Sequence, residues 1–538
     1  MKLLSLNKKT VLIIIFLSLV KLSAFSANYY ISTSGSDSNL GTTVGSPKLT
    51  LASVFSTYNL GAGDIINVAA GTYSEKGISV GSNDEGFSIS GAPLVAGVPS
   101  SIFSSNQTAG WLTISDANND NITISRIKVL NYKASSTGSN EGGSGIRCWI
   151  DGVTGLSLSY CFFDNCDAPA SGGGGTIHIK NYSAPATISL SNVTICNSNN
   201  PNSGAVLVES TQDIDMTFVK CKLYSNTSGG SGSAFSILAG AGSSVTFTNC
   251  LLYKNNITSS GGHGALWIDY TNKNTTLSMT NCTVYNNTAQ SSYCGGVYTG
   301  TNSTLKNCII YGNTWRDVVR NYGTVTLDYS FYTSVSGFTP TNSSTSDPQL
   351  NNIASDDYSL ASGSRSIDFG NLLGAPSDDI RNYSRVNNPD AGAFESNGVL
   401  LPIELLNFNG EVSSNSNFIF WSTASECDND YFVLEKSIDG INWIVIDRVK
   451  GQGNSHRIVN YNFTDYEINS NVSYYKLIQV DLNGKIKKYS PISLKSNFGN
   501  SNFVYKNQLG QQVDYENSPS GVYLKCFEDG TSVKVFKN

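Results

Sequence analysis

Apolar residues between positions 127 and 313 recur in two short patterns that alternate along the chain. A glycine-led apolar stretch, as in 264–269, is followed by a segment of the form Asn-Cys-x-apolar, as in 281–287. The pair returns about every 29 residues, the length of one repeat of a stacked architecture. Neither stretch is long enough to bury its own apolar side chains, so successive copies must stack on one another.

Two markers follow the repeat independently. The first is an apolar or thiol slot at the start of the second stretch, occupied by Ile127, Cys161, Val193, Cys221, Cys250, Cys282 and Cys308. The second is the inward residue near the start of the glycine-led stretch, occupied by Ile146, Ile177, Val206, Phe235, Leu266 and Tyr298. The two markers stay in step, and one repeat accommodates three short strands and three turns. We therefore expect an all-β fold whose main domain is a right-handed parallel β-helix.

The cysteines of the slot predict a ladder of free thiols. The chain has 11 cysteines, and five of them occupy this slot in different coils. Adjacent strands lie about 4.8 Å apart, and stacked side chains point the same way. Their Cβ atoms are then slightly too far apart for a relaxed disulfide. We expect these thiols to be buried and unpaired.

Asparagine recurs at the end of the slot strand, at Asn226, Asn255, Asn287 and Asn313. Asparagine tolerates a left-handed backbone, and its amide can bond to neighbouring turns. Stacked asparagines at one corner of the coil predict a ladder of amides with a structural role.

Residues 1–26 have the pattern of a secretory signal peptide. Lys2, Lys8 and Lys9 precede the apolar run 11–20, and Ala24-Phe25-Ser26 is an acceptable cleavage site. The run is too short to span a membrane, and no later stretch reaches spanning length. We expect a secreted or surface-exposed protein. Charged residues make up only 14% of the chain, with a formal net charge of −6, which argues against nucleic-acid binding.

Both ends of the predicted β-helix carry further motifs. Residues 30–37, 41–42, 46–47 and 63–73 read Tyr-Ile-Ser-Thr-Ser-Gly-Ser-Asp, Gly-Thr, Ser-Pro and Gly-Asp-Ile-Ile-Asn-Val-Ala-Ala-Gly-Thr-Tyr, and 390–395 reads Asp-Ala-Gly-Ala-Phe-Glu. In these motifs the chain resembles the pectate-lyase-like β-helix proteins of Bacteroidota. The resemblance implies a β-helix over 27–397 with an N-terminal cap that includes a short helix within 49–59. It implies no particular activity, because this superfamily holds lyases, hydrolases and proteins without catalytic function.

The pattern changes after residue 398. Residues 400–496 alternate over longer strands, which predicts a β-sandwich and resembles the fibronectin-like module of many secreted Bacteroidota proteins. Residues 497–538 resemble a short type IX secretion sorting domain, through 507–513, 519–524 and 534–538. That resemblance implies the type IX secretion machinery as a partner, with release or anchoring at the outer cell surface. The tail departs from the family in lacking the usual opening strands with an Asn-Pro turn.

Candidate functional residues lie on the outward face of the glycine-led strands. Strand alternation predicts two outward columns, the first with Arg147, His178, Leu207, Ser236, Trp267 and Thr299, the second with Trp149, Lys180, Glu209, Leu238, Asp269 and Thr301. Trp149 and Trp267 offer flat amphipathic rings about 19 Å apart, four strand spacings along the stack. A polysaccharide lying along the helix axis would contact both rings. Glycan binding is the preferred hypothesis, and an ordinary polar surface on a passive spacer remains open.

Catalysis is the alternative use of this face. Glu209 and Asp269 are expected about 9.6 Å apart, near the range of about 6.5–9.5 Å for carboxylates of inverting glycoside hydrolases. A polysaccharide lyase would use Lys180 or His178 as the base. It would also need a cation over the substrate carboxylate, either Arg147 or a Ca²⁺ held by Glu209 and Asp269. No complete catalytic signature is present, so the sequence leaves open whether the protein is an enzyme, and it predicts no resident cofactor beyond this Ca²⁺.

Overall fold

The computed structural model describes residues 26–538 apart from 106–108, 116–120, 135–141, 151–154, 169–173, 239–241, 269–274, 291–293, 397–403, 414–415, 456–458, 468–471, 482–483, 496–502, 508, 516, 528–531 and 538. The predicted signal segment, except for Ser26, lies outside the described residues. The chain forms two compact units, residues 1–401 and 402–538. The described helices include none long and apolar enough to cross a membrane.

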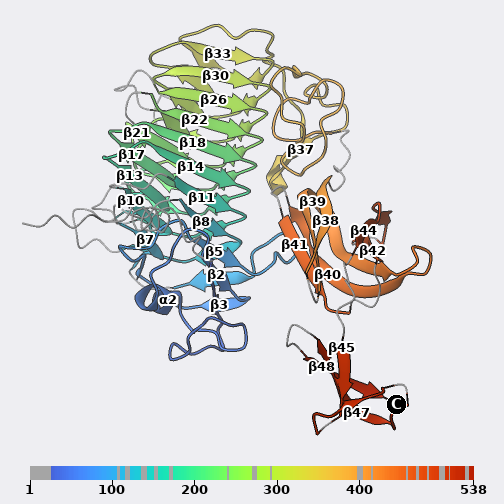
Figure 1. Cartoon of the computed structure of the whole chain (residues 1–538). Helices are drawn as coiled ribbons and strands as arrows, with labels where there is room; N and C mark the ends of the chain where they lie inside the picture. The colour runs from blue at the N-terminus through green and yellow to red at the C-terminus, as the bar shows by residue number, and fades with distance from the viewer. Residues whose placement is uncertain are drawn as a thin grey trace, which may run out of the picture. The chain divides into compact units, whose positions relative to one another are not determined.

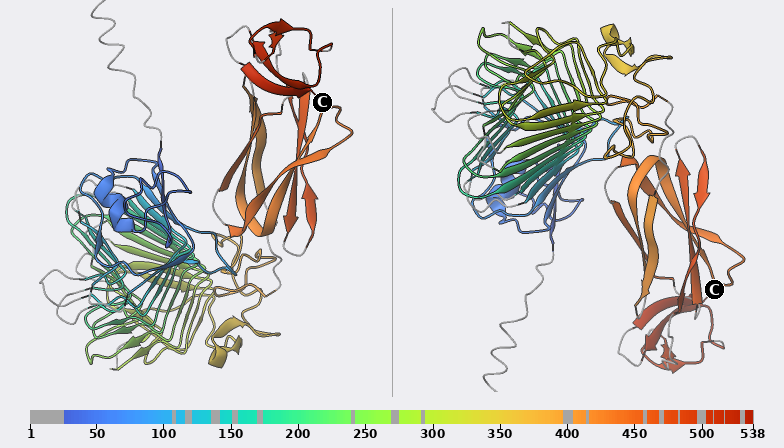
Figure 2. Two further views of the ribbon diagram at one scale, coloured as in Figure 1. Left: turned by 90° about the horizontal axis from the view of Figure 1, so that it is seen from below. Right: turned by 90° about the horizontal axis from the view of Figure 1, so that it is seen from above.

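The first unit is a stack of coils whose strands form three long parallel sheets, confirming the predicted all-β parallel helix (Figure 1). Seen from below and above, strands of successive coils overlie one another (Figure 2). Sheet A contains β1 (Asn28–Ile31), β2 (Ile65–Val68), β5 (Ser88–Gly91), β8 (Ile122–Ser125), β11 (Gly155–Ser159), β14 (Ala186–Ser191), β18 (Ile214–Val219), β22 (Ser244–Thr248), β26 (Thr276–Thr280), β30 (Asn302–Lys306) and β33 (Val325–Asp328).

Sheets B and C complete each coil. Sheet B contains β3 (Gly71–Tyr73), β6 (Ser101–Ser104), β9 (Ile127–Leu130), β12 (Phe162–Asp164), β15 (Thr194–Cys196), β19 (Lys222–Tyr224), β23 (Leu251–Tyr253), β27 (Thr283–Tyr285), β31 (Ile309–Tyr311) and β34 (Phe331–Tyr332). Sheet C contains β4 (Ile78–Ser79), β7 (Leu112–Ile114), β10 (Ile146–Ile150), β13 (Ile177–Asn181), β17 (Val206–Ser210), β21 (Phe235–Leu238), β25 (Leu266–Ile268), β29 (Val297–Thr299), β32 (Val318–Arg320) and β35 (Val335–Ser336). A short fourth sheet contains β16 (Asn199–Asn200), β20 (Thr227–Ser228), β24 (Asn256–Ile257) and β28 (Thr288–Ala289).

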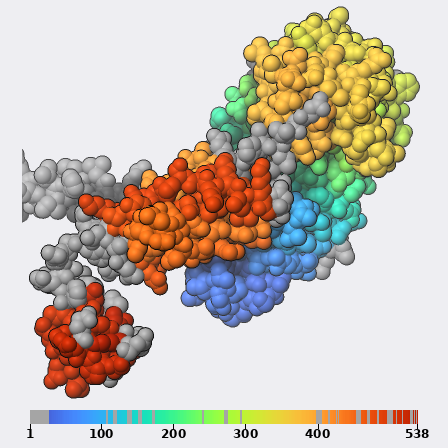
Figure 3. Space-filling model, turned by 90° about the vertical axis from the view of Figure 1, so that its right-hand side faces the viewer, coloured from blue at the N-terminus to red at the C-terminus, as the bar shows by residue number. Residues whose placement is uncertain are grey.

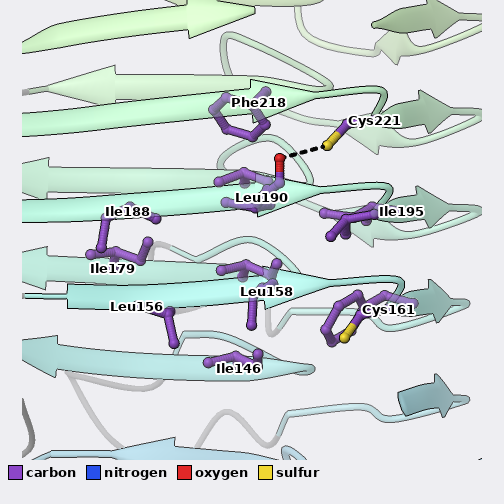
Figure 4. Packing of buried hydrophobic residues seen from close by; sticks show 14 of the residues in the cluster. Ile146, Leu156, Leu158, Cys161, Ile179, Ile188, Leu190, Ile195, Phe218 and Cys221 are labelled. Carbon is purple, nitrogen blue, oxygen red and sulfur yellow. Dashed lines mark hydrogen bonds between the residues drawn. The ribbon is translucent and has the colours of Figure 1, made fainter. Parts of the chain in front are cut away.

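The interior is filled by alternate residues of all three sheets (Figure 4). Leu156 and Leu158 from sheet A face Ile146 from sheet C, and all three side chains are buried. Burial of such aliphatic side chains supplies the main stabilising term of the stack. The Sγ atom of Cys221 lies at the turn between sheets A and B and donates to the carbonyl oxygen of Leu190 at 3.3 Å.

The thiol slot is confirmed. Cys161, Cys221, Cys250, Cys282 and Cys308 are free and buried. Each thiol bonds a backbone carbonyl instead of another sulfur, as Cys250 does to Phe218 at 3.4 Å. The column continues one coil beyond the predicted residues, where the Oγ atom of Ser330 accepts from the backbone N–H of Cys308 at 2.9 Å.

The asparagine ladder is also confirmed, with one correction to its backbone. Asn226 Nδ2 donates to Asn255 Oδ1 at 3.0 Å, Asn255 to Asn287 at 2.9 Å, and Asn287 to Asn313 at 2.9 Å. The left-handed conformation belongs to the residue before each ladder member, at Ser225, Lys254, Asn286 and Gly312. The ladder amides are therefore free to stack because the preceding residue makes the corner.

An N-terminal cap covers the first coil, as predicted. Its helix α2 (Leu51–Thr57) begins after Thr50, whose side chain accepts from the N–H of Ser53. The Glu75 carboxylate accepts from the N–H groups of Leu51 at 2.8 Å and Ala52 at 3.0 Å. These bonds satisfy donors that a helix N-terminus leaves without intrahelical partners.

Residues 345–396, here called the strap, return along the outer face of sheet B (Figure 3). The strap contains β36 (Leu350–Asn352), the 3₁₀ turn η1 (Ile353–Ser355) and β37 (Asp357–Leu360). Its backbone carbonyls accept from three corner asparagines of successive coils, Asn249, Asn281 and Asn307. Arg385 and Glu395 form a buried ion pair at 3.0 Å inside it.

The second unit is antiparallel. Its larger sheet contains β38 (Glu404–Val412), β39 (Asn417–Ser437), β40 (Ile444–Ser455), β41 (Val459–Asp465), β42 (Val472–Asp481), β43 (Ile486–Lys488) and β44 (Ile492–Lys495). The long strand β39 pairs with β38 and β41 through its first half and with β40 and β42 through its second. This bending closes a sandwich-like core around Trp421, Phe432 and Tyr475. A separate sheet holds β45 (Phe503–Lys506), β46 (Gln512–Val513), β47 (Gly521–Phe527) and β48 (Ser532–Lys537).

Candidate functional site

Five of the seven predicted site residues lie together on sheet C. Strands β10, β13 and β17 pair in parallel, so that Arg147 lies beside His178, and Trp149, Lys180 and Glu209 follow one another across three coils. We call these five residues the sheet C cluster. The inward residues Ile177, Ile179, Val206 and Val208 of the same strands are buried and apolar, which fixes the strands and directs the cluster to the outer face.

His178 and Glu209 are the most closely coupled pair in the cluster. His178 Nε2 lies 2.9 Å from Glu209 Oε2, and the His178 side chain is fully buried. Burial lowers the pKa of His178, so the neutral imidazole donates from Nε2 to the carboxylate. Its Nδ1 is then an acceptor, and this buried atom has no hydrogen-bond partner among the described residues. The hydrogen bond from His178 lowers the pKa of Glu209 most, and the charge of Lys180 is a smaller cause in the same direction.

Lys180 places a cation at the solvent edge of the same group. Its Nζ lies 3.3 Å from Glu209 Oε2, and the two side chains remain 21% and 32% exposed. Glu209 is thus held by two partners, yet one side of it faces water. A carboxylate with this support keeps its position and is ready to accept from a ligand hydroxyl.

Trp149 carries two cations against its ring. The guanidinium carbon of Arg147 lies 4.2 Å from the ring centroid, and Lys180 Nζ lies 5.5 Å from it. Both distances fall within the range of cation–π attraction. Trp149 itself is half-buried. With His178 neutral, two cations against one carboxylate leave the cluster net positive.

The sequence predicted an outward face that is continuous from Trp149 to Trp267. The structure shows that this face is interrupted. Leu207 and Ser236, which separate the two ends, are buried. Ser236 Oγ donates to the carbonyl of Ser231 at 2.6 Å, so the glycine-rich loop before β21 folds back against this part of the sheet. Alternation along a strand fixes which way a side chain points but not what a neighbouring loop covers.

Trp267 belongs to a second aromatic group. It is half-buried and pairs in register with Tyr298 of the next coil. The ring of Tyr298 stacks on His263 with centroids 4.3 Å apart. The sequence placed Tyr298 inside and Thr299 outside, which is wrong: Val297 pairs with Leu266 and Thr299 with Ile268, so these two face the core. A shift of one residue in register reverses every side chain of the strand.

Catalytic pairing with Asp269 stays a prediction, because Asp269 lies outside the described residues. Glu209, its expected partner, bonds His178 and Lys180. The described residues include no group of three His, Cys, Asp or Glu side chains that would hold a metal ion. Sequence reasoning missed the pairing of Tyr298 with Trp267. Taking Val297 instead of Tyr298 as the inward residue of the last repeat would have placed Tyr298 on the outer face beside Trp267.

Comparisons of the sequence with protein-family models and with curated proteins gave no match. The functional argument therefore rests on the sheet C cluster and on the Trp267 group.

Proposed function

We propose that the chain is an extracellular glycan-binding protein that uses the outer face of sheet C. The observation that supports this most is the fixed position of the Trp149 ring, against which Arg147 and Lys180 are placed. A sugar presents an apolar C–H face and a polar hydroxyl edge, and an aromatic ring flanked by charged groups complements both.

The side chains around Trp149 are preorganised for such a ligand. Glu209 accepts from His178 and Lys180, so its position is set by the protein and little conformational entropy is lost when a hydroxyl donates to it. The Trp267–Tyr298 pair offers a second aromatic contact. It lies four strand spacings, about 19 Å, from the strand of Trp149 along the axis of the stack. Two aromatic contacts at this distance favour an extended oligosaccharide over a single sugar.

A second candidate is a polysaccharide lyase or glycoside hydrolase acting on the same face. The observation that favours it is the His178–Glu209 pair, in which a carboxylate orients a neutral imidazole whose Nδ1 has no described partner. A histidine held in this way is suited to proton abstraction. Its complete burial favours a positioning role over direct attack, so binding remains the preferred function.

Export and surface display belong to the same proposal. They rest on the signal-like residues 1–26 and on the resemblance of the tail to type IX sorting domains. The pectate-lyase-like and fibronectin-like family assignments also remain proposals, supported by the motifs and by the β-helix followed by antiparallel sheets.

A polysaccharide panel with the full mature chain tests the function. Binding is measured by affinity electrophoresis while unsaturated ends, by ultraviolet absorption, and reducing ends are read in parallel. We expect binding without new chain ends, weakened about tenfold or more in the Trp149→Ala/Trp267→Ala double variant, because buried aromatic anchors carry much of the energy of an interface.

Trp315→Ala is the matched control, since Trp315 is 54% exposed on the same unit but belongs to none of the sheet C strands. New chain ends that disappear in His178→Gln would instead support the enzyme. Absence of any binding across the panel, with a folded protein, would refute the glycan-binding proposal.

A further inference from the structure

We propose that a cleft between sheet B and the strap binds a single neutral sugar ring. The cleft has a volume of about 230 Å³ and is lined by Tyr285, Asp347, Gln349, Leu350, Asn351, Asn352, Ile353 and Ala354. It shares no residue with the sheet C cluster, so it does not depend on the function proposed there.

The floor of the cleft belongs to a column of four tyrosines on the outer face of sheet B. Tyr224, Tyr253, Tyr285 and Tyr311 pair in register across four coils. The rings of Tyr224 and Tyr253 stack with centroids 4.7 Å apart. Those of Tyr285 and Tyr311 are farther apart, at 6.1 Å.

The strap covers one part of this column and leaves another part open. Tyr358 of β37 packs against Tyr253 at 4.5 Å and against Tyr285 at 5.6 Å. Tyr253 is buried beneath it, whereas Tyr285 and Tyr311 remain half-buried. Of these two tyrosines, Tyr285 lines the cleft, beside a wall formed by β36 and η1.

The wall is polar. Asp347 and Gln349 precede β36, and Asn351 and Asn352 lie on it, all with exposed side chains. Burial, and next the negative charge of Asp347, raise the pKa of both Tyr285 and Tyr311, which indicates that the carboxylate lies near both phenols. Asn351 Nδ2 donates to Asp357 Oδ2 at 2.6 Å and is held in place.

This combination selects a carbohydrate. An aromatic ring binds the C–H face of a sugar, while amide and carboxylate groups exchange hydrogen bonds with its hydroxyls. The cleft is smaller than the usual range of about 300–1,000 Å³ for drug-sized ligands, which limits it to one ring. Among the described residues, its lining includes Asp347 but no Lys, Arg or His, so a neutral sugar is favoured over an acidic one.

The test uses the full mature chain and four probes, the methyl glycosides of glucose, galactose, mannose and xylose, with galacturonate as the acidic comparison. Saturation-transfer NMR detects contact, and titration calorimetry gives affinities. We expect at least one methyl glycoside to bind saturably in the millimolar range, and galacturonate to bind more weakly. Tyr285→Ala should weaken binding about tenfold, and Tyr285→Phe should retain most of it, because the ring and not the hydroxyl makes the contact.

Two further variants keep the test independent of folding. Asn352→Ala removes an exposed amide and should weaken binding, while Asp347→Asn should reduce the preference against galacturonate. Tyr322→Ala, at a tyrosine that is 47% exposed and not part of the cleft, should change nothing. The proposal fails if no methyl glycoside binds saturably, or if Tyr285→Ala and Asn352→Ala bind as the native protein does. Loss of monosaccharide binding in Trp149→Ala/Trp267→Ala, with binding intact in Tyr285→Ala, would place the sugar on sheet C instead.

Discussion

Asp317 ends the asparagine ladder by accepting two hydrogen bonds from Asn313. Its Oδ1 atom lies 2.8 Å from Asn313 Nδ2 and 3.0 Å from the backbone nitrogen of Asn313. Every ladder amide donates toward the C-terminal end of the stack, so the final amide needs an acceptor that donates nothing in return. An ionised carboxylate meets this requirement, and its other oxygen accepts from the N–H of Ser334 at 3.0 Å.

Removing one amide from the ladder should destabilise the stack. In Asn287→Ala the buried N–H of Asn255 loses its acceptor, Asn287 Oδ1, at 2.9 Å. We expect a loss of about 2 kcal/mol, typical of a buried donor left without a partner. Urea unfolding followed by circular dichroism measures it. Asn388→Ala, at an exposed asparagine, should change stability by less than about 0.5 kcal/mol; equal losses in the two variants would contradict a structural role for the ladder.

Glycine is required where the loops before sheet C stack on one another. A Cβ atom at Gly204 would lie 1.8 Å from the carbonyl oxygen of Gly232. Gly204→Ala must therefore displace backbone, and we expect a loss of about 3 kcal/mol or more. Gly261→Ala is the matched control, because nothing lies within 4 Å of a Cβ there. It should be neutral or slightly stabilising, and thermal unfolding of both variants provides the comparison.

The buried thiols should not react in the native protein. Burial raises the pKa of Cys148 to about 12 and that of Cys250 well above its usual value, and the thiol form is a poor nucleophile. Alkylation with iodoacetamide followed by peptide mass mapping should modify the partly exposed Cys526 quickly and these two only on unfolding. A reductant should leave the melting temperature unchanged. A disulfide-linked peptide from the slot would refute the thiol ladder.

The His178–Glu209 pair should make the protein less stable in acid. The pKa of His178 is lowered from 6.5 by burial, so below pH 6.5 the unfolded chain binds a proton that the folded imidazole does not, and the free energy of unfolding falls. The pKa of Glu209 is lowered from 4.5, so its contribution is present above pH 4.5 and lost as pH falls through the folded value.

Melting temperatures between pH 7.5 and 5.5 test the histidine part of this prediction. His178→Gln should lose less stability over this range than the native protein. Burial also lowers the pKa of His263, so His263→Gln is the comparison variant. The variant with both substitutions should show the smallest change in melting temperature over this pH range. An unchanged pH slope in His178→Gln would show that the His178 charge state does not differ between the folded and unfolded chain.

Breaking the buried ion pair of the strap should release it from sheet B. Arg385 and Glu395 have side chains only 2% and 1% exposed, and losing one partner of such a pair costs about 3–5 kcal/mol. We expect Glu395→Gln to increase proteolytic cleavage within 345–396 before the coils are attacked. Arg365→Met, at an exposed arginine of the strap, should not. Simultaneous cleavage of strap and coils would contradict separate release.

The coil could be predicted from sequence because its two markers depend on local alternation. The slot residues and ladder asparagines each repeat in a fixed place, and the backbone hydrogen bonds between coils enforce that register. The same reasoning was wrong at Tyr298, because Leu266 pairs with Val297 at the same spacing that separates Phe235 from Leu266. Val297 also has the apolar side chain that a buried position requires, and it is fully buried.

Coverage by distant segments was not predictable. The burial of His178 and Ser236 depends on loops and neighbouring coils. The strap lies on sheet B although as many as 162 residues separate the contacting segments, as for Lys220 and Asn382. No periodicity records such contacts. The tyrosine column at 224, 253, 285 and 311 was visible in the repeat, but only the strap turns one part of it into a cleft.

The strap has a mechanical consequence for how the molecule comes apart. In a simple stack each coil touches only its neighbours, so the end coil can peel away and the next follows. Here one continuous segment is bonded to the coils that carry Asn249, Asn281 and Asn307 at once. Peeling one of them requires detaching the tether that also holds the others. The C-terminal coils should therefore resist a pulling force as a single block. The number of coils that the strap bonds sets the size of the smallest unfolding step.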